Sequence, residues 1–557
     1  MKLFRYLKKV FRNYSDADRG ISFACLAIIL LMVIKMIIFP YGLFNFGKVD
    51  IYTEGLVGKN GFQNLNPMLV DYNDLDREVC RLVFSGLMKY DTNTRAIIGD
   101  MANLTINEEK TEYTFVLKEG VKWQDGEDLT VEDVFFTFSE VVQDPTFPNE
   151  ILKTNFDGVD IVVVNENTIR FTLEKPNVFF ITNLTTGILP EHILEDVPVV
   201  DLLRHKFNKQ PIGSGPYMVS EPVEKFKDGR MQVSLKVNKY YYGINPKLEN
   251  FRFISYPTEQ DLMASLHSVN GIVKVSGDSA EAIKATSEFV MFAYQLPQYM
   301  AVFMNLDSPK LEEHMVRLAL LKAVDKSVLI ERLKDKKALD TPLLELDTGE
   351  WVYEPHIGSA NGAIFDAGYS YPTDDSEFRA GSDGAVLDLI LISRAFDEGT
   401  SQAKEMEIAT NYLIEQWNSI GIKITHMSLP VSDLNERIMD RSYDLLFIGQ
   451  TLGYNLDTYS YLHSTQVGAN GLNLSNYKSF HVDSLIEDIR NTFDEVKRTE
   501  KLKQIADRLS KDIPAIYLYK PVYYYASNGK VNGVDMTGVS FPSDRFSNIS
   551  EWQFDRK

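Results

Sequence analysis

Few residues in this sequence are arranged as catalytic groups usually are. Ser214 stands between two glycines in Gly213–Tyr217 (GSGPY), yet Pro216 follows it, and the G-x-S-x-G pattern of a nucleophilic serine is absent. The sequence also lacks the H-E-x-x-H pattern of zinc proteases and the G-x-x-x-x-G-K-[ST] phosphate loop. The acidic stretch Asp71–Asp76 lacks the glycine and the terminal glutamate of a calcium loop. We therefore expect a protein that is not an enzyme and holds no metal and no cofactor.

Composition narrows the class of protein further. The 557 residues carry 78 Asp and Glu against 58 Lys and Arg, a net charge of −20, whereas nucleic-acid-binding proteins normally present a basic face. Apolar residues make up 44% and charged residues 24%, which excludes both a disordered chain and a polytopic membrane protein. Two cysteines exclude a disulfide framework and a four-thiolate metal site. The sequence indicates a large globular body, which we expect to be monomeric and to bind no nucleic acid.

One apolar segment near the N-terminus differs from the rest. Residues Ile21–Phe39 are apolar except for Ser22 and Lys35, and about 19 helical residues span roughly 28 Å, close to the hydrocarbon thickness of a bilayer. Residues 1–20 hold six basic and two acidic side chains, and the positive-inside rule keeps such a segment in the cytoplasm. A cleaved signal peptide and lipoprotein processing at Cys25 are alternatives, but no A-x-A-like site follows and the lipobox match is poor. We expect an uncleaved, single-pass signal anchor in the cell membrane, with the main domain outside the cytoplasm.

Strand-like and helical patterns alternate along the rest of the chain. Alternation of apolar and polar residues predicts strands at Glu112–Leu117, Asp160–Val164, Thr168–Leu173, Gln232–Val237 and Phe251–Ser255. Apolar residues at helical spacing predict helices at Asp76–Leu87, Thr130–Val142, Glu259–Leu266, Leu311–Ala323, Gln402–Ile420 and Ser484–Leu509. Thr130, with Asp133 three residues later, forms a variant of the capping box that opens a helix. Interleaved strands and helices indicate an α/β or α+β fold.

Several short blocks follow one another in a definite order. The most specific is Gly120–Gly126 (GVKWQDG) with Thr130–Phe135 (TVEDVF) after it, and Ile212–Tyr217 (IGSGPY) supports it. The others are Asn64–Met68 (NLNPM), Val83–Asp91 (VFSGLMKYD), Asn238–Gly243 (NKYYYG) and Ile513–Tyr519 (IPAIYLY). The glycines permit tight turns or close approach of backbones, and Trp123 can fill a core between strand and helix. In this order the blocks resemble the family 5 extracellular solute-binding proteins, the oligopeptide- and dipeptide-binding subunits of ABC importers, over roughly residues 48–540.

The resemblance implies an α/β, two-lobed periplasmic-binding-protein-like fold of type II with an extra subdomain, here behind an N-terminal transmembrane helix. Lobe I would comprise residues 48–90, 205–300 and 511–557, an additional subdomain of residues 91–204 would pack on it, and lobe II would comprise residues 301–510. The lobes would close over a ligand by a hinge motion. The ligand main chain would pair with strand edges while its side chains occupy roomy pockets, so binding would not depend on peptide sequence.

The predicted lobe II loop departs from the family pattern. Peptide-binding members carry an aspartate there that pairs with the ligand's α-ammonium, whereas this chain has Leu452 and Gly453, followed by Tyr454 and Asn455. A buried ammonium without a carboxylate loses a charge-assisted hydrogen bond, commonly worth about 1.5–3 kcal/mol. Asp457 either reaches the ligand from a shifted register or caps the helix that follows. Both interpretations stay open, and so does the choice between a peptide and another small polar solute.

Matching positions of the family give the candidate ligand-binding residues. They lie at the start of lobe I, in the glycine–proline turn, beside the hinge and in the lobe II loop, and they are Phe62, Asn66, Gly215, Tyr299, Asn305, Gln450, Thr451, Leu452, Gly453, Tyr454, Asn455 and Asp457. Tyrosine and asparagine suit a cleft that needs apolar faces with adaptable hydrogen bonds, although the packing of strands and turns explains the same residues. Arg394, after a predicted strand, would meet a ligand carboxylate bidentately or stay exposed.

Two functions from different classes follow. The first is a membrane-tethered receptor that captures a peptide or similar small polar solute and delivers it unchanged to ABC permease subunits. The second is a scaffold or sensory protein that retains the fold and binds another envelope protein through its lobe surfaces. The resemblance favours the first, whereas the missing aspartate and the retained anchor lean toward the second. Bulky side chains filling the space between the lobes would favour it further.

Overall fold

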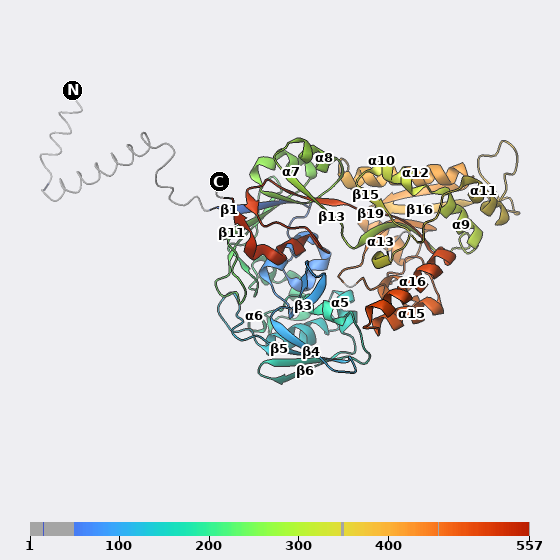
Figure 1. The fold of residues 1–557 in the computed structure, drawn as a ribbon. Helices are drawn as coiled ribbons and strands as arrows, with labels where there is room; N and C mark the ends of the chain where they lie inside the picture. The colour runs from blue at the N-terminus through green and yellow to red at the C-terminus, as the bar shows by residue number, and fades with distance from the viewer. Residues whose placement is uncertain (1–14, 16–49, 347–349, 455, 470, 556–557) are drawn as a thin grey trace, which may run out of the picture. The chain divides into compact units, whose positions relative to one another are not determined.

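The computed structural model describes residues 15, 50–346, 350–454, 456–469 and 471–555 (Figure 1). Backbone contacts divide the chain into two compact units, Met1–Asp50 and Ile51–Lys557, and the elements below belong to the second. The predicted anchor Ile21–Phe39 lies outside the described residues. Among the described residues, none forms a helix that is both long and apolar enough to cross a bilayer.

The first sheet gathers strands from both ends of this unit. Its order is β13 (Val290–Tyr294), β20 (Tyr523–Ser527), β12 (Gly271–Val275), β1 (Ile51–Val57), β11 (Asn250–Tyr256), β10 (Met231–Val237) and β8 (Tyr217–Val219), with β9 (Glu224–Lys225) also paired to β10. β1 runs parallel to β11 and β12, and the other pairs are antiparallel. Helices α7 (Glu259–Ala264) and α8 (Gly277–Ala285) lie at one edge of this first half (Figure 1).

The second sheet comes from one stretch of chain. Its order is β15 (Lys336–Ala338), β19 (Ala515–Pro521), β14 (Gln298–Met304), β18 (Leu445–Thr451), β16 (Asp388–Arg394) and β17 (Lys423–Leu429). Alternate residues of β14 enter two different cores: Val302 and Met304 pack in one, and Ala301 and Phe303 in the other. Because both faces are covered, β14 is apolar along most of its length.

Helices cover the second sheet and complete the second half of the unit. They are α9 (His314–Ala323), α10 (Lys326–Leu333), α11 (Ile357–Asp366), α12 (Ser401–Ser419), α13 (Val431–Met439), α14 (Tyr459–Leu462), α15 (Phe480–Arg490) and α16 (Glu495–Asp512). The larger core combines β14, β16, β18 and β19 with α9, α11 and α12, whereas α15 and α16 form a separate cluster. These helices fill the right-hand part of Figure 1.

A smaller layer is attached to the first half. It holds the antiparallel sheet β4 (Ala102–Ile106), β5 (Glu112–Leu117), β7 (Thr168–Thr172) and β6 (Asp160–Asn165), with α4 (Val131–Phe135), a π-helical continuation (Phe136–Val142), α5 (Glu150–Phe156) and α6 (Glu191–Leu194). Two short ribbons are β2 (Met88–Asp91) with β3 (Ala96–Gly99), and β21 (Val531–Asn532) with β22 (Gln553–Phe554). One continuous core runs through this layer and the first sheet, and Trp123 is fully buried in it.

Most of the predicted elements are confirmed, with two helices that differ. The five predicted strands are β5, β6, β7, β10 and β11, and the capping box of Thr130 and Asp133 opens α4. The predicted helix Ser484–Leu509 is wrong, since Asp494 accepts hydrogen bonds from the amides of Val496 and Lys497 and so starts a new helix after α15. The helix predicted at Asp76–Leu87 is α3 (Asp74–Val83), which ends where the backbone becomes extended.

The predicted division into two lobes and a subdomain remains a prediction, but two of its boundaries differ from the strand pairing. Residues 298–300 and 515–521, predicted for lobe I, belong to β14 and β19 of the second sheet. The chain therefore passes between the two sheets at residues 295–297 and at Val522. Gln298 Nε2 donates a hydrogen bond to the hydroxyl of Tyr523 at 2.5 Å, which joins the two passages.

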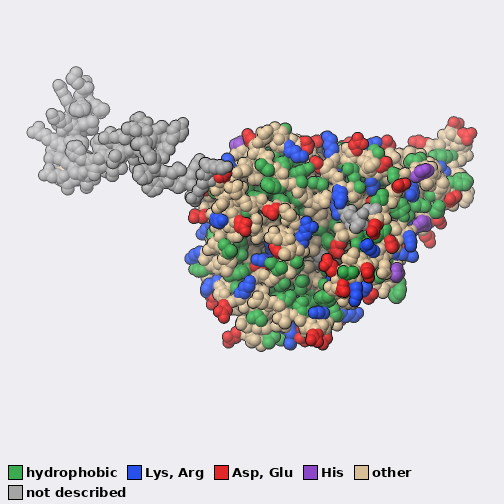
Figure 2. Space-filling view, viewed as in Figure 1, with side chains coloured by type: hydrophobic (Ala, Val, Ile, Leu, Met, Phe, Trp, Pro, Cys, Tyr) green, Lys and Arg blue, Asp and Glu red, His purple; other side chains and the backbone are tan. Residues whose placement is uncertain are grey.

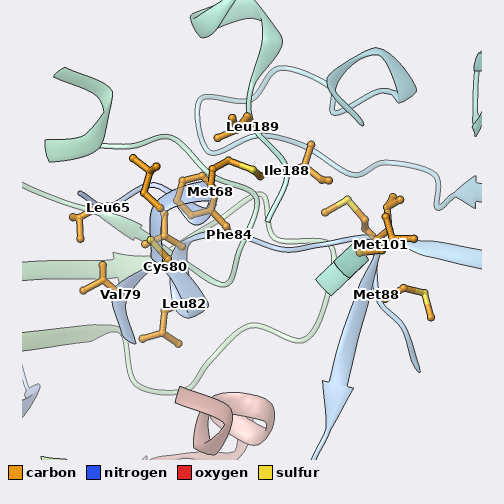
Figure 3. Packing of buried hydrophobic residues seen from close by; sticks show 14 of the residues in the cluster. Leu65, Met68, Val79, Cys80, Leu82, Phe84, Met88, Met101, Ile188 and Leu189 are labelled. Carbon is orange, nitrogen blue, oxygen red and sulfur yellow. The ribbon is translucent and has the colours of Figure 1, made fainter. Parts of the chain in front are cut away.

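Helix α3 is held by close packing on its apolar face. Figure 3 shows Val79, Cys80 and Leu82 from this helix among the side chains of neighbouring segments. The amide of Gly215 donates to the carbonyl of Val83 at 2.8 Å, and a Cβ at position 215 would lie 2.6 Å from the carbonyl oxygen of Leu82. Only glycine permits this approach of two backbones.

A buried ion cluster fixes α3 to both ends of the unit. Arg545, on the 3₁₀ segment Pro542–Glu551, is fully buried and bonds the carboxylates of Glu54 on β1 and Glu78 on α3. Its contact with Glu78 measures 2.5 Å, and the hydroxyl of Tyr525 donates to Glu54 at 2.5 Å. Since such charges are tolerated in a core only when paired and hydrogen-bonded, the three side chains depend on one another.

We expect Arg545→Met to lower the free energy of unfolding by about 3–5 kcal/mol, because it leaves two carboxylates buried without their cation. Urea unfolding followed by tryptophan fluorescence measures the change. Arg332→Met is the matched control, since its ion pair with Glu415 at 2.9 Å is exposed, and it should barely move the midpoint. Equal midpoints for the two variants would contradict the importance of the cluster.

Gly215→Ala should destabilise the protein by about 1–3 kcal/mol, because the added methyl group meets backbone atoms that cannot move aside. Gly362→Ala, within α11, adds the same methyl group where nothing lies within 4 Å and should be neutral or slightly stabilising. Thermal unfolding of both variants measures the difference. If Gly215→Ala unfolds at the temperature of the unaltered protein, the close approach is unimportant.

Candidate functional site

A cavity of about 850 Å³ lies between the two halves, and we call it the central cleft. From the first half it is lined by Val57, Lys59, Asp74, Pro257, Thr258, Glu259, Gln260, Lys274 and Ser276. From the second half it is lined by residues 298–300, 394–400, 448–451 and parts of α12, and by residues near the chain passages. Backbone edges, hydroxyls, aromatic rings and charges of both signs therefore face one space, as in sites for small ligands.

Two further cavities extend along the same loop of the second half. The α3 pocket, about 270 Å³, is lined by Leu452–Tyr454 on one side and by α3 residues on the other. The α15 pocket, about 520 Å³, is lined by Tyr459, Ser460 and the end of α15. The two pockets share Ile151 and Asn155. Gln450 and Thr451 at the end of β18 line the central cleft, residues 452–454 line the α3 pocket, and Tyr459 and Ser460 line the α15 pocket.

Three predicted residues line the central cleft: Tyr299, Gln450 and Thr451. The hydroxyl of Tyr299 donates to Gln450 Oε1 at 2.6 Å, and Gln450 Nε2 donates to the carbonyl of Leu472 at 3.1 Å. Burial raises the pKa of Tyr299, so its hydroxyl stays protonated and remains a donor. This chain of bonds orients the amide of Gln450 at the cleft wall.

Three more predicted residues line the α3 pocket: Leu452, Gly453 and Tyr454. Gly453 has a φ of +76°, and a Cβ there would meet nothing within 4 Å. The hydroxyl of Tyr454 donates to Asp544 Oδ1 at 2.7 Å, and its ring stacks on Tyr90 with centroids 4.7 Å apart. Burial and the nearby Asp544 carboxylate raise the pKa of Tyr454, so it is a neutral group at physiological pH.

Asp457 is engaged by neighbouring groups. Its Oδ2 accepts hydrogen bonds from Arg490 Nε at 3.0 Å and from Arg490 Nη2 at 2.7 Å, and its Oδ1 accepts from the amide of Tyr459 at 3.1 Å. The guanidinium of Arg490 also lies 3.9 Å from the centroid of the Tyr459 ring. The N-cap position of α14 is Thr458, but Asp457 still binds the first amide of that helix, and a ligand ammonium would have to compete with Arg490 for it. Asn455 lies outside the described residues.

The other predicted residues do not line these three cavities. Phe62 is fully buried in the main core. Asn66 is buried as well, where its Oδ1 accepts from the amide of Met68 at 3.0 Å and its Nδ2 donates to Asn208 at 3.2 Å. The resemblance identifies these blocks by their order in the chain, and it does not tell which side chain of a block faces inward.

Gly215 and Asn305 also have structural roles, because their contacts are with the protein itself. Gly215 packs against the end of α3. Asn305, just beyond β14, donates to the carbonyls of Arg441 and Tyr443, each at 3.1 Å, and accepts from Asn476 at 3.1 Å. Its hydrogen bonds are satisfied within the second half, so it organises the loops at the far end of that sheet.

Sequence reasoning missed the charged wall of the α3 pocket. Arg77 and Arg81 line it from one face of α3, together with the rings of Phe84 and Phe541. The two arginines stand four residues apart, a spacing that places them on the same side of a helix. That spacing, on a helix whose opposite side is apolar, is the signal that could have revealed them. Arg394, at the end of β16, lines the central cleft and is exposed, so both interpretations of it stay open.

Polar contacts join the two halves at one rim of the central cleft. Glu259 Oε2, on α7, accepts from the hydroxyl of Ser401 at 2.8 Å, at the start of α12, and from Ser279 at 2.6 Å. Lys404 on α12 lies 2.5 Å from Asp278 on α8. A carboxylate at a helix N-terminus is also favoured by the helix dipole, so Glu259 is well placed to hold α12 against the first half.

The chemistry of these walls suits binding. Among the described residues, no three His, Cys, Asp or Glu side chains gather as metal ligands would. On the face shown in Figure 2, acidic and basic side chains are interspersed and do not form a basic field. Hydroxyl, amide and guanidinium groups beside aromatic rings can hold a polar organic molecule through hydrogen bonds and stacking.

Comparisons with known proteins agree with this arrangement. A model described as bacterial extracellular solute-binding proteins, family 5 Middle, matches residues 96–473. The oligopeptide-binding protein AppA of Bacillus subtilis is 25% identical over 516 residues, which cover 91% of this chain and 92% of AppA. The structure of that AppA in complex with a nonapeptide has a TM-score of 0.73 at 23% identity, over 91% of this chain and 99% of AppA.

A second solved structure gives the same fold. NikZ from Campylobacter jejuni, in complex with Ni(L-His), has a TM-score of 0.75 at 24% identity, over 91% of this chain and all of NikZ. The two halves described above are therefore the lobes of a mixed α/β, periplasmic-binding-protein-like fold. The chain belongs to the bacterial extracellular solute-binding proteins of family 5.

Proposed function

We propose that this protein captures a peptide or a similar small polar solute between its lobes and delivers it, chemically unchanged, to the permease subunits of an ABC importer. The observation that carries the proposal is that residues 450–454, Tyr459 and Ser460 line three cavities in turn, which gives room for an extended ligand. The relative AppA is named for oligopeptide binding, which supports a peptide. The NikZ complex with Ni(L-His) supports a broader range of polar solutes.

We further propose the placement of the protein in the cell. The basic segment 1–20 stays in the cytoplasm, residues 21–39 anchor the chain in the membrane, and the lobes act outside the cytoplasm as a monomer. The layer around β4–β7 is the additional subdomain of a type II fold. Support comes from the length and flanking charge of the apolar segment and from the negative net charge of the whole chain.

The scaffold function is less well supported by the shape of the space between the lobes. That function would be favoured by bulky side chains filling the space, whereas the central cleft alone has about 850 Å³ of room. The cleft walls also carry exposed hydrogen-bonding groups such as the hydroxyl of Thr451, which a purely structural surface would not need to expose.

A thermal-shift experiment tests capture directly. The full chain, kept in mild detergent, is mixed with libraries of di- to pentapeptides, and ligand at 100 times its Kd should add about 2.7 kcal/mol of stability. Thr451→Trp places an indole in the central cleft and should abolish the shift. Thr105→Trp, on the exposed face of β4, is the matched control and should keep it. Libraries that leave the unfolding temperature unchanged would count against peptide capture.

Glu259→Ala should shift the ligand-free protein toward more open forms, because it removes the acceptor for Ser401 and Ser279 and the charge at the start of α12. Small-angle X-ray scattering should then give a larger radius of gyration than for the unaltered protein. Glu281→Ala is the control, since Glu281 pairs with Lys284 on its own helix and crosses no cleft. An unchanged radius for Glu259→Ala would show that the rim contacts do not hold the lobes together.

A further inference from the structure

The charge of the α3 pocket differs from that of a site for an ammonium group. Among the described side chains that line it, Arg77 and Arg81 are the only charged ones, and none is acidic. The remaining wall is made of rings, short polar side chains and backbone, including Phe84, Tyr454 and Phe541. A ligand entering this pocket therefore meets two positive charges.

Arg81 is the arginine available to a ligand. It is half-buried, and among the described residues it has no hydrogen bond or ion pair, whereas Arg77 pairs with Asp74 at 3.0 Å and covers the ring of Phe541 at 4.5 Å. The nearby Asp544 does not bond Arg81, because its Oδ1 accepts from Tyr454 and its Oδ2 accepts from the amides of Ser540 and Phe541.

Neighbouring carboxylates keep Arg81 cationic. Burial lowers the pKa of Arg81, but the nearby carboxylates of Asp544 and Asp100 raise it, and the net shift is upward. Two like charges four residues apart on α3 repel each other. An incoming anion would relieve that repulsion and would fill the empty bonding positions of the guanidinium fork.

The opposite wall lacks the group that an ammonium would need. It is formed by Leu452, Gly453 and Tyr454, none of which carries a negative charge. Asp457, the nearest acidic residue along the loop, is bonded to Arg490. The loop and α3 thus present a neutral and a positive wall to the same volume.

We propose that the α3 pocket binds a carboxylate of the ligand, with the Arg81 guanidinium as its anchor and the rings of Tyr454 and Phe541 beside it. The proposal rests on solute capture in the cleft and specifies which charged group of the solute is recognised there. The carboxylate can belong to a peptide or to an organic acid without peptide bonds, and two experimental arms distinguish these sources.

The first arm uses random tripeptides in four forms: free, N-acetylated, C-amidated and blocked at both ends. Thermal shift of the full chain in mild detergent gives an apparent Kd for each form. Free and N-acetylated peptides should bind alike, and C-amidation should weaken binding about 10- to 100-fold, the range expected for one charge-assisted hydrogen-bonded pair. Equal binding of free and amidated peptides, or loss of binding on N-acetylation alone, would overturn the proposal.

Variants assign the effect to Arg81. Arg81→Gln should remove the preference for a free carboxylate, and Arg81→Lys should reduce it, since lysine keeps the charge but not the planar fork. Arg204→Gln, an exposed arginine elsewhere on the first half, should keep the full preference. A preference that survives in Arg81→Gln would contradict the assignment.

A second pair of variants leaves Arg81 in place. Gly453→Asp puts a carboxylate into open space on the opposite wall and should cancel the preference, whereas Gly453→Asn tolerates the same positive φ and should retain it. Identical behaviour of these two variants would speak against an electrostatic site.

The second arm uses succinate, glutarate and citrate. One outcome is that no peptide library stabilises the protein, whereas these acids stabilise the unaltered protein but not the Arg81→Gln variant. Peptide capture then fails, and the carboxylate site stands. If neither peptides nor acids shift the unfolding temperature, the carboxylate site fails as well.

Discussion

The buried contact of Arg545 with Glu54 and Glu78 is the interaction on which the arrangement of the site depends. It joins β1, α3 and the C-terminal 3₁₀ segment through side chains that are almost completely buried. A charged cluster of this kind adds little net stability compared with an apolar core, but it penalises any arrangement in which one member is missing. The position of α3 is thereby tied to both ends of the unit, and α3 carries one wall of the ligand space.

Three further contacts restrict α3, each from a different direction. Asp76 accepts hydrogen bonds from the amides of Gln63 and Asn64 at 2.9 and 2.8 Å, and Gly215 approaches the last turn of the helix. The apolar face packs on the main core. The remaining face is the one that presents arginines to the α3 pocket, so a rigidly held helix supports the charged group and fixes where it points.

Much of the fold could be predicted from the sequence, and the site much less well. Alternating patterns and the Thr130 capping box located strands and a helix start, because these signals depend on neighbouring residues. The break at Asp494 was missed since a capping aspartate on a polar helix looks like any solvated residue. Tyr299, Gln450 and the loop 452–454 were found through their place in the family blocks. Phe62, Asn66 and Asn305 came from the same blocks but lie outside the three cavities. Arg81 could be recognised only from the structure, which shows that Asp457 and Asp544 are hydrogen-bonded to other groups.

The pairing of β1 with β12, which also pairs with β20, has a consequence for how the chain acquires its structure. The lobe containing these strands requires residues near position 51 and near position 545 at the same time, so it cannot be finished until the segment with Arg545 has been synthesised. The other lobe uses only residues 298–521 and can be complete earlier in synthesis. The long-range closure of the first lobe should therefore be the slow event in maturation, and the recognition space, which needs both, comes into being last.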